Sequence, residues 1–205
     1  MSSGLRERKK QATRETIADA AMKLFSQRGF DAVTVAEVAD EAGVSEKTVF
    51  NYFPTKEDLF FDEIDEREAA LLASLRSRKP GESMLAALSR TAAANCERLT
   101  SEHFSRFAKL VEDAPSLQTK ERQMFARFTR TVADELVAEG VPEAEAAVAS
   151  AAVAGVYAWM FATARTRAMA GEHGPTALRR LRKEVARGFA LLDRGLGAFA
   201  RKQAS

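Results

Sequence analysis

The chain has 205 residues, enough for one domain with a sizeable core or for two small domains. Its 31 Lys and Arg nearly balance its 29 Asp and Glu, which excludes a uniformly polycationic protein. The single cysteine excludes an intramolecular disulfide, and the first residues lack the apolar segment of a signal peptide, so we expect a cytoplasmic protein.

The spacing of apolar residues predicts the fold class. These residues recur at every third or fourth position and runs of β-branched residues are absent, which favours an all-α protein of about nine helices. We expect a three-helix DNA-binding domain over residues 1–54 and a helical effector-binding and dimerisation domain over 55–205.

The N-terminal residues concentrate positive charge, with five Lys and Arg against one Glu in residues 1–14. We expect a mobile arm over residues 1–10 that either reaches DNA phosphates or remains a solvated tail. A helix should follow over residues 11–28 and end at Gly29. Its buried stripe should consist of Ile17, Ala20, Ala21, Leu24 and Phe25.

Residues 34–53 have the pattern of a helix-turn-helix. Thr34 and Glu37 are spaced as a capping box at the start of the first helix. Gly43 suits the left-handed position that ends this helix, Ser45 is the N-cap of the second, and Pro54 ends it.

The second of these helices is expected to enter a DNA major groove. Val49 should pack inward against Ala39, which leaves a polar face with flanking aromatic residues outward; the alternative is a solvated surface helix. The expected DNA-binding residues are Thr34, Ser45, Glu46, Lys47, Thr48, Phe50, Asn51, Tyr52 and, at the start of the next helix, Lys56.

One helix is predicted over residues 56–78, with Thr55 and Asp58 as its capping box. Its apolar stripe contains Leu59, Phe60, Ile64, Leu71 and Leu75. As the only predicted covalent link between the two domains, this helix should carry any signal between them.

Three helices are predicted next, over residues 83–99, 102–113 and 115–139, and their apolar faces are rich in Phe and Met. These side chains either form an ordinary core or line a cavity for an apolar or aromatic small molecule. The candidate ligand-binding residues are Asn95, Cys96, His103, Phe104, Phe107, Met124, Phe125, Phe128, Tyr157 and Met160.

Two long helices are predicted at the C-terminal end, over residues 142–170 and 175–200. Glu145, Arg165 and Arg167 interrupt the first, so we do not expect a membrane span. The second has an apolar stripe of Leu178, Leu181, Val185, Phe189, Leu192, Leu196 and Phe199. The two helices favour a homodimer interface, with packing inside one chain as the alternative.

Enzymatic chemistry has no support in the sequence. The two histidines, His103 and His173, lie far apart, and no HExxH, GxSxG, P-loop or dinucleotide motif occurs. The Cys and His clusters that zinc requires are also missing from the sequence. We therefore expect neither an enzyme nor a cofactor or metal site.

Residues 17–60 resemble the tetracycline-repressor (TetR) family of bacterial transcriptional regulators. The positions that carry the resemblance are Leu24, Phe25, Gly29, Phe30, Thr34, Val38, Ala39, Ala42, Gly43, Val44, Ser45, Tyr52, Phe53, Lys56 and Leu59. The resemblance implies a repressor that a small effector releases from double-stranded operator DNA. It also implies a backbone contact by Lys56, an effector pocket among the middle helices and dimerisation through the last two. The alternative is a constitutive or architectural DNA-binding factor without an effector.

Overall fold

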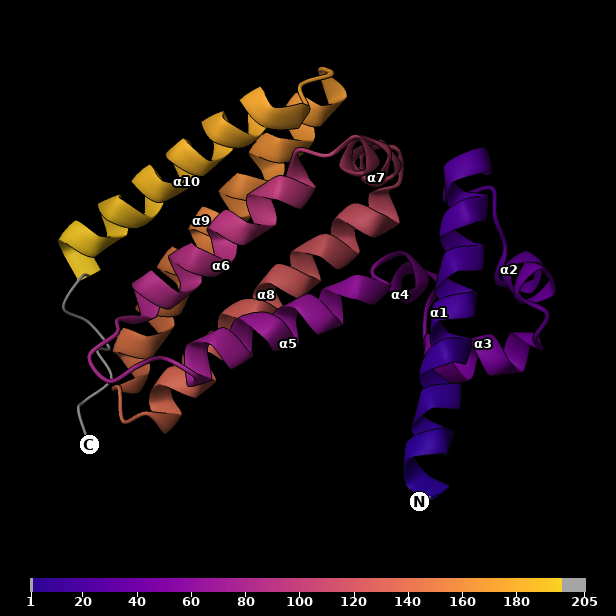
Figure 1. The fold of residues 1–205 in the computed structure, drawn as a ribbon, viewed down its shortest axis with the longest axis horizontal. Helices are drawn as coiled ribbons and strands as arrows, with labels where there is room; N and C mark the ends of the chain where they lie inside the picture. The colour runs from indigo at the N-terminus through magenta and orange to yellow at the C-terminus, as the bar shows by residue number, and fades with distance from the viewer. Residues whose placement is uncertain (1, 197–205) are drawn as a thin grey trace. The chain divides into compact units, whose positions relative to one another are not determined.

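The computed structural model describes residues 2–196, and for residues 2–5, 7, 63–66 and 196 it describes the backbone only. Within this range the chain forms ten helices and no strand, which confirms the predicted all-α class (Figure 1). The helices are α1 (Ser2–Arg28), α2 (Val35–Ala42), α3 (Glu46–Tyr52), α4 (Lys56–Phe60), α5 (Asp62–Arg76), α6 (Met84–Leu99), α7 (Glu102–Asp113), α8 (Pro115–Ala138), α9 (Glu143–Met169) and α10 (Gly174–Leu196).

The described residues group into two compact units. The first, called the reading unit below, contains the residues up to Glu66 together with Leu110–Lys120. The second, called the helical unit, contains Arg67–Lys109 and the residues from Glu121 onward. Because α5, α7 and α8 each run from one unit into the other, the predicted single covalent link is one of three. The domain boundary placed at residue 55 stays a prediction.

The reading unit is built on α1, against which α2 and α4 pack, while α3 packs on α2. Its core contains a group of three phenylalanines, with the Phe25 ring centroid 5.0 Å from that of Phe30 and 6.3 Å from that of Phe60. All three side chains are buried. Burial of one such side chain stabilises a fold by about 1.5–3 kcal/mol, so this group contributes much to the stability of a small unit.

Helix α1 begins at Ser2, so the predicted mobile arm is wrong for the residues that the structure describes. The segment before Gln11 is rich in Arg and Lys, which are good helix formers. Extending an existing helix also requires no new nucleation, so α1 continues toward the N-terminus. The basic side chains of Arg6, Arg8, Lys9 and Lys10 are exposed along this extension.

The single helix predicted over residues 56–78 is interrupted at Phe61, which has φ −99° and ψ 21°. Adjacent residues of a continuous helix point about 100° apart, so one helix would not bury both Phe60 and Phe61 on the same side. With the interruption both are buried, and their rings meet edge to face at 5.0 Å. Burial of two neighbouring aromatic rings therefore outweighs one turn of regular helix.

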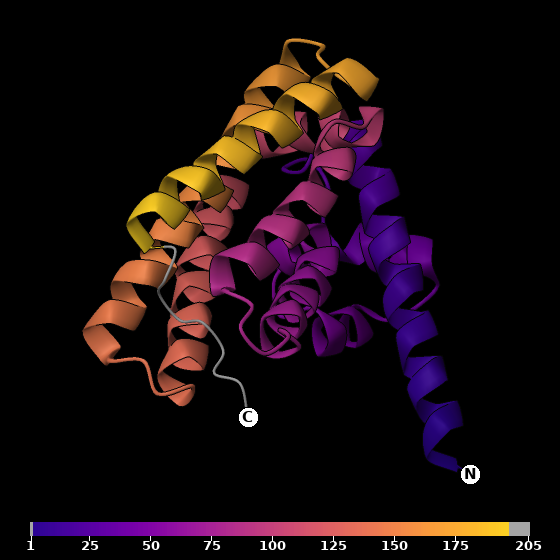
Figure 2. The same ribbon diagram turned by 60° about the vertical axis from the view of Figure 1, so that its left-hand side comes forward.

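In the helical unit, α10 packs against α6 and α9, and both ribbon views show these three helices side by side (Figures 1 and 2). Helix α9 is long and apolar enough to cross a membrane by length and composition alone. Its buried face, which includes Val153, Tyr157 and Met160, belongs to the core of this unit. The basic residues near its C-terminal end form ion pairs, Arg165 with Glu121 at 2.6 Å and Arg167 with Glu184 at 2.7 Å. These features are those of a core helix.

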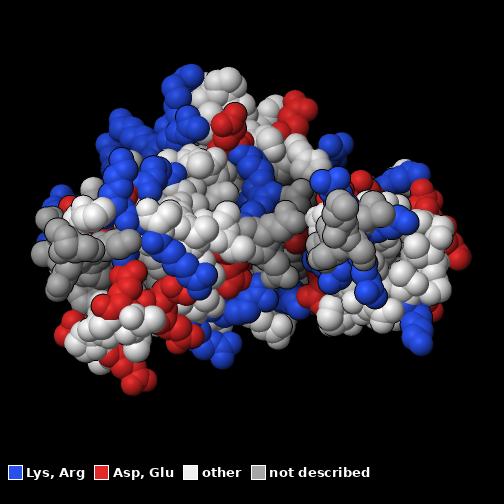
Figure 3. All heavy atoms as spheres, turned by 60° about the horizontal axis from the view of Figure 1, so that its bottom comes forward, with Lys and Arg blue, Asp and Glu red and all other residues white. Residues whose placement is uncertain are grey.

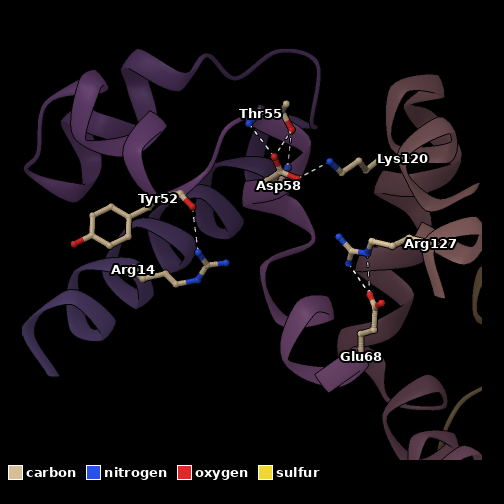
Figure 4. Close-up of polar contacts among 7 residues, drawn as sticks. All are labelled: Arg14, Tyr52, Thr55, Asp58, Glu68, Lys120 and Arg127. Atoms are coloured by element: carbon tan, nitrogen blue, oxygen red, sulfur yellow. Dashed lines mark hydrogen bonds and ion pairs between the residues drawn. The ribbon is translucent and has the colours of Figure 1, made fainter. Parts of the chain in front are cut away.

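Ion pairs join α5 to α8 within the helical unit. Arg127 donates from Nε and Nη2 to one carboxylate oxygen of Glu68, at 3.0 and 2.6 Å (Figure 4). Arg76 pairs with Glu135 farther along the same two helices. Beyond the end of α5, the buried Arg78 side chain pairs with Glu139. The described part of α5 is therefore held to α8 along its length.

Candidate nucleic-acid interface

Local hydrogen bonds define both ends of the α2–turn–α3 segment. The Thr34 amide donates to the Glu37 carboxylate at 2.8 Å, and the Glu37 amide donates to the Thr34 hydroxyl at 3.2 Å, which completes the predicted capping box. Gly43 has φ +67° and ends α2 in the left-handed conformation. The Ser45 hydroxyl then accepts a hydrogen bond from the Thr48 amide and starts α3.

The two faces of α3 differ as the sequence predicts. Val49 is fully buried and Ala39 of α2 is 2% exposed, so both lie in the core of the reading unit. On the other side Lys47 and Asn51 are exposed, and the aromatic side chain of Phe50 is 45% exposed. The remaining predicted contact residues are also accessible: Thr34, Ser45 and Glu46 are exposed, and Thr48, Tyr52 and Lys56 are half-buried. Helix α3 thus presents a polar face with an aromatic residue to solvent.

Lys56 lies at the start of α4, with its Nζ 4.2 Å from the centroid of the Phe30 ring. Partial burial lowers the pKa of the Lys56 ammonium, while the carboxylates of Asp31, Glu57 and Glu37 act in the opposite direction. A cation over an aromatic face is stabilised there by about 0.5–1 kcal/mol at an accessible site. The charge of Lys56 is therefore partly fixed in position.

Lys47 is a more exposed charge than Lys56. Across the part of the chain that the structure describes, no ion pair involves Lys47. On the face drawn in Figure 3, Lys and Arg side chains occur over both units and alternate with acidic ones. Positive charge available to an anionic partner is thus local to particular side chains and is not a general property of the surface.

The candidate ligand-binding residues are only partly brought together. The core of the helical unit contains Cys96, Phe104, Phe128, Tyr157 and Met160, and Phe107 and Phe125 pack against it. The Phe128 and Tyr157 rings lie 5.5 Å apart. These seven residues form the aromatic cluster discussed below.

Three candidates lie outside the aromatic cluster. The predicted role of His103 is corrected, because its side chain is exposed on α7, whose apolar residues Phe104 and Phe107 form the buried side. Asn95 and Met124 are half-buried and do not belong to the core of the helical unit. Their residue types suited a pocket, but their helical positions place them at its margin.

The polar groups inside the aromatic cluster already have hydrogen-bond partners. The Tyr157 hydroxyl donates to the Leu88 carbonyl at 2.8 Å, and the Cys96 thiol donates to the Ala92 carbonyl at 3.4 Å. Burial raises the pKa of the Tyr157 hydroxyl and raises the pKa of the Cys96 thiol to about 11. Both groups are therefore neutral at physiological pH, and the cluster is essentially apolar.

The sequence pattern did not identify which apolar residues of α9 and α10 remain uncovered. Val148 is 65% exposed, Trp159 is 42% exposed and Leu191 is 63% exposed. Leu192, which was predicted as part of the apolar stripe, instead packs against the core. Two further stripe residues, Leu196 and Phe199, lie outside the described side chains. The only tryptophan was the one available signal for an exposed apolar surface.

Known proteins resemble the chain in sequence over its N-terminal part. Residues 17–62 match the family described as bacterial regulatory proteins, tetR family. The transcriptional regulator TcmR of Streptomyces glaucescens is 36% identical over 86 residues, which are 42% of this chain and 38% of TcmR. RutR of Escherichia coli (strain K12) is 33% identical over 87 residues, 42% of this chain and 41% of RutR. The chain thus matches about two-fifths of the length of these curated relatives.

Solved structures resemble the chain over most of its length. NalD of Pseudomonas aeruginosa, the secondary repressor of the MexAB-OprM multidrug efflux pump, has a TM-score of 0.57 at 20% identity, covering 87% of this chain and 97% of NalD. FadR of Bacillus halodurans, a fatty acid degradation regulator, has a TM-score of 0.54 at 18% identity, covering 87% and 93%. These likenesses show a shared fold. With the sequence match across the α2–turn–α3 segment, they establish that the chain belongs to the tetR family of bacterial regulatory proteins.

Proposed function

We propose that this protein is a cytoplasmic transcriptional regulator that binds double-stranded operator DNA through α3. The observation that carries the proposal is the exposed polar face of α3 above the buried pair Ala39 and Val49. A major groove about 12 Å wide admits a helix, where Asn pairs with adenine and Lys with guanine or phosphate. Asn51 and Lys47 supply these groups, and Lys56 supplies a phosphate contact beside them.

We propose further that two copies of the chain associate through α9 and α10. The exposed side chains of Val148, Trp159 and Leu191 lie on these helices and gain by removal from water. A dimer of a helix-turn-helix protein also binds two half-sites at once, which raises its affinity for an operator. The uncovered apolar residues support this assembly over packing within one chain alone.

The proposed effector is a small apolar or aromatic molecule that binds at the aromatic cluster and releases the repressor from DNA. The cluster favours such a ligand because its polar groups are already satisfied. The same satisfied groups also favour the second candidate function, a DNA-binding factor without an effector. A ligand that saturates the cluster should lower operator affinity about 5- to 150-fold, and operator DNA should weaken ligand binding equally. Unchanged operator affinity with ligand bound would favour the factor without an effector.

The experiment begins with selection of duplex DNA from a random pool by the purified protein. Affinity for the selected site is then measured by fluorescence anisotropy over a series of KCl concentrations. Lys47→Met and Lys56→Met should each lower the slope of log affinity against log salt by about one. The charge-matched control is Lys183→Met, on an exposed position of α10, which should leave the slope unchanged.

Asn51→Ala tests base recognition separately from charge. It should reduce preference at particular base pairs by roughly 5- to 150-fold and leave the salt slope unchanged. If the unmodified protein enriches no duplex, the proposed DNA binding is wrong. If Lys47→Met, Lys56→Met and Lys183→Met behave alike, α3 and α4 do not face the DNA.

A further inference from the structure

Arg14 belongs by sequence to the basic N-terminal stretch, but the structure turns its side chain toward the protein. Its Nη1 donates to the Tyr52 carbonyl at 3.1 Å (Figure 4). Its guanidinium carbon lies 4.4 Å from the centroid of the Phe53 ring. The other terminal nitrogen, Nη2, forms an ion pair with the Asp62 carboxylate. One side chain of α1 therefore contacts the end of α3 and the start of α5, all within the reading unit.

The contact with Tyr52 provides something that α3 lacks. The last carbonyls of a helix have no partner within it and carry its negative dipole end. Helix α3 ends at Tyr52 and has no basic residue in its last turn, and Pro54, two residues later, has no N–H to donate. Arg14 thus supplies the cation and the hydrogen bond at this C-terminus from a helix 38 residues earlier in the chain.

The contacts with Phe53 and Asp62 restrict where the guanidinium can lie. Phe53 is 1% exposed, so its ring is a fixed surface under the guanidinium. The Asp62 side chain is only 19% exposed and that of Arg14 27%, so water screens this ion pair less than a fully exposed one. A group fixed by a ring and a carboxylate can in turn fix the direction of the carbonyl that accepts its hydrogen bond.

We infer that Arg14 is a positioning residue that sets the orientation of α3, and so determines how well the protein distinguishes its operator from other DNA. The inference rests on the proposed DNA-binding function. It differs from a phosphate contact, which is what the basic N-terminal stretch suggests, because a phosphate contact adds affinity for every sequence. A small rotation of α3 would instead misplace Lys47 and Asn51 relative to base edges and reduce discrimination.

The chemistry of these contacts requires arginine in particular. A planar guanidinium stacks on a ring while its terminal nitrogens donate in two different directions. A lysine ammonium retains the charge, but it cannot stack as a plane or span the carbonyl and the carboxylate together. Arg14→Lys therefore separates the two roles, since lysine would serve well as a phosphate contact.

The test compares the unmodified full-length protein with Arg14→Lys, Arg14→Gln and the control Lys10→Gln, which changes an exposed cation of the same helix. Affinity is measured for the selected duplex and for an unrelated duplex, each over a series of KCl concentrations. Both Arg14 variants should lower the ratio of the two affinities roughly tenfold, with the salt slope unchanged. Lys10→Gln should leave the ratio unchanged.

Two results would overturn the inference while the proposed function stands. One is that Arg14→Lys retains the ratio while Arg14→Gln loses about one unit of salt slope, which is the pattern of a phosphate contact. The other is that both Arg14 variants bind as the unmodified protein does. If the unmodified protein selects no duplex, the proposed function fails and this inference fails with it.

Circular dichroism shows whether the Arg14 variants fold. If they do not, Asp62→Asn provides the second test, because it removes the ion pair and leaves Arg14 in place. A loss of the affinity ratio of at least twofold, at constant salt slope, is then the expected result. An unchanged ratio in a folded Asp62→Asn protein would count against Arg14 as a positioning residue.

Discussion

Lys120 donates to the carboxylate of Asp58, with Nζ 2.6 Å from Oδ1 (Figure 4). Asp58 also accepts the Thr55 amide at 2.9 Å, so one carboxylate completes the capping box of α4 and pairs with the start of α8. Partial burial by itself raises the pKa of Asp58, but the hydrogen bonds from Lys120 and Thr55 and the lysine charge outweigh it and lower this pKa. The ionised carboxylate therefore connects two segments far apart in the chain within the reading unit.

A double-mutant cycle of Asp58→Asn and Lys120→Met should measure this connection. Both side chains are about one quarter exposed, so the expected coupling is about 0.5–1 kcal/mol. Urea denaturation followed by circular dichroism gives the four unfolding free energies. The matched control is the more exposed pair Lys23 and Glu41, where the coupling should be smaller. Equal coupling in the two cycles would contradict a special role for Asp58.

Stability should fall in acid partly through Glu37. Hydrogen bonds from the Thr34 amide and from Arg28 lower the pKa of Glu37 from 4.5 to about 2. Because the folded-state pKa lies below the unfolded one, the contribution of Glu37 is complete above the unfolded pKa of 4.5 and disappears as pH falls to about 2. Glu37→Gln should therefore have a flatter profile of unfolding free energy between these two pH values. Profiles that remain parallel across the window would show that this carboxylate contributes nothing.

Two substitutions at the α2–turn–α3 segment separate packing from backbone strain. Ala39→Leu places a larger side chain in a filled core and should destabilise the protein by about 1–3 kcal/mol. At Gly43 a Cβ would meet no atom within 4 Å, so Gly43→Ala should cost only the left-handed backbone strain, about 1–2 kcal/mol. Gly43→Asn is the control and should cost less, because Asn tolerates this conformation. Thermal melts in which Ala39→Leu is as stable as the unmodified protein would reject the packing.

Neighbouring leucines of α10 should respond differently to charge. Leu191 is 63% exposed, so Leu191→Glu should weaken the proposed dimer without unfolding the chain. Leu192 packs against the core, so Leu192→Glu should lower the melting temperature. Sedimentation velocity at micromolar concentration and circular dichroism measure the two effects. An unmodified protein that sediments as a monomer would contradict the dimer itself.

The local signals of the sequence were sufficient for the elements around α3. Thr34, Gly43, Ser45 and Thr55 define helix ends through hydrogen bonds and dihedral angles of residues within three or four positions. Such features depend little on the rest of the fold, which is why a single sequence predicts them. The accessible face of α3 follows equally from helical periodicity once Ala39 and Val49 are placed inward.

The tertiary structure alone decided what several side chains do. A sequence shows Arg14 as one more basic residue, Leu191 and Leu192 as equivalent leucines, and Phe61 as a continuation of a helix. Their roles depend on Tyr52 and Asp62 beside Arg14, on the core beside Leu192 and on Phe60 beside Phe61. Burial and ion pairing are set by groups brought close in space from distant positions, or by the orientation of a helix toward its neighbours. Neither is encoded in local spacing, so these roles became visible only in the folded chain.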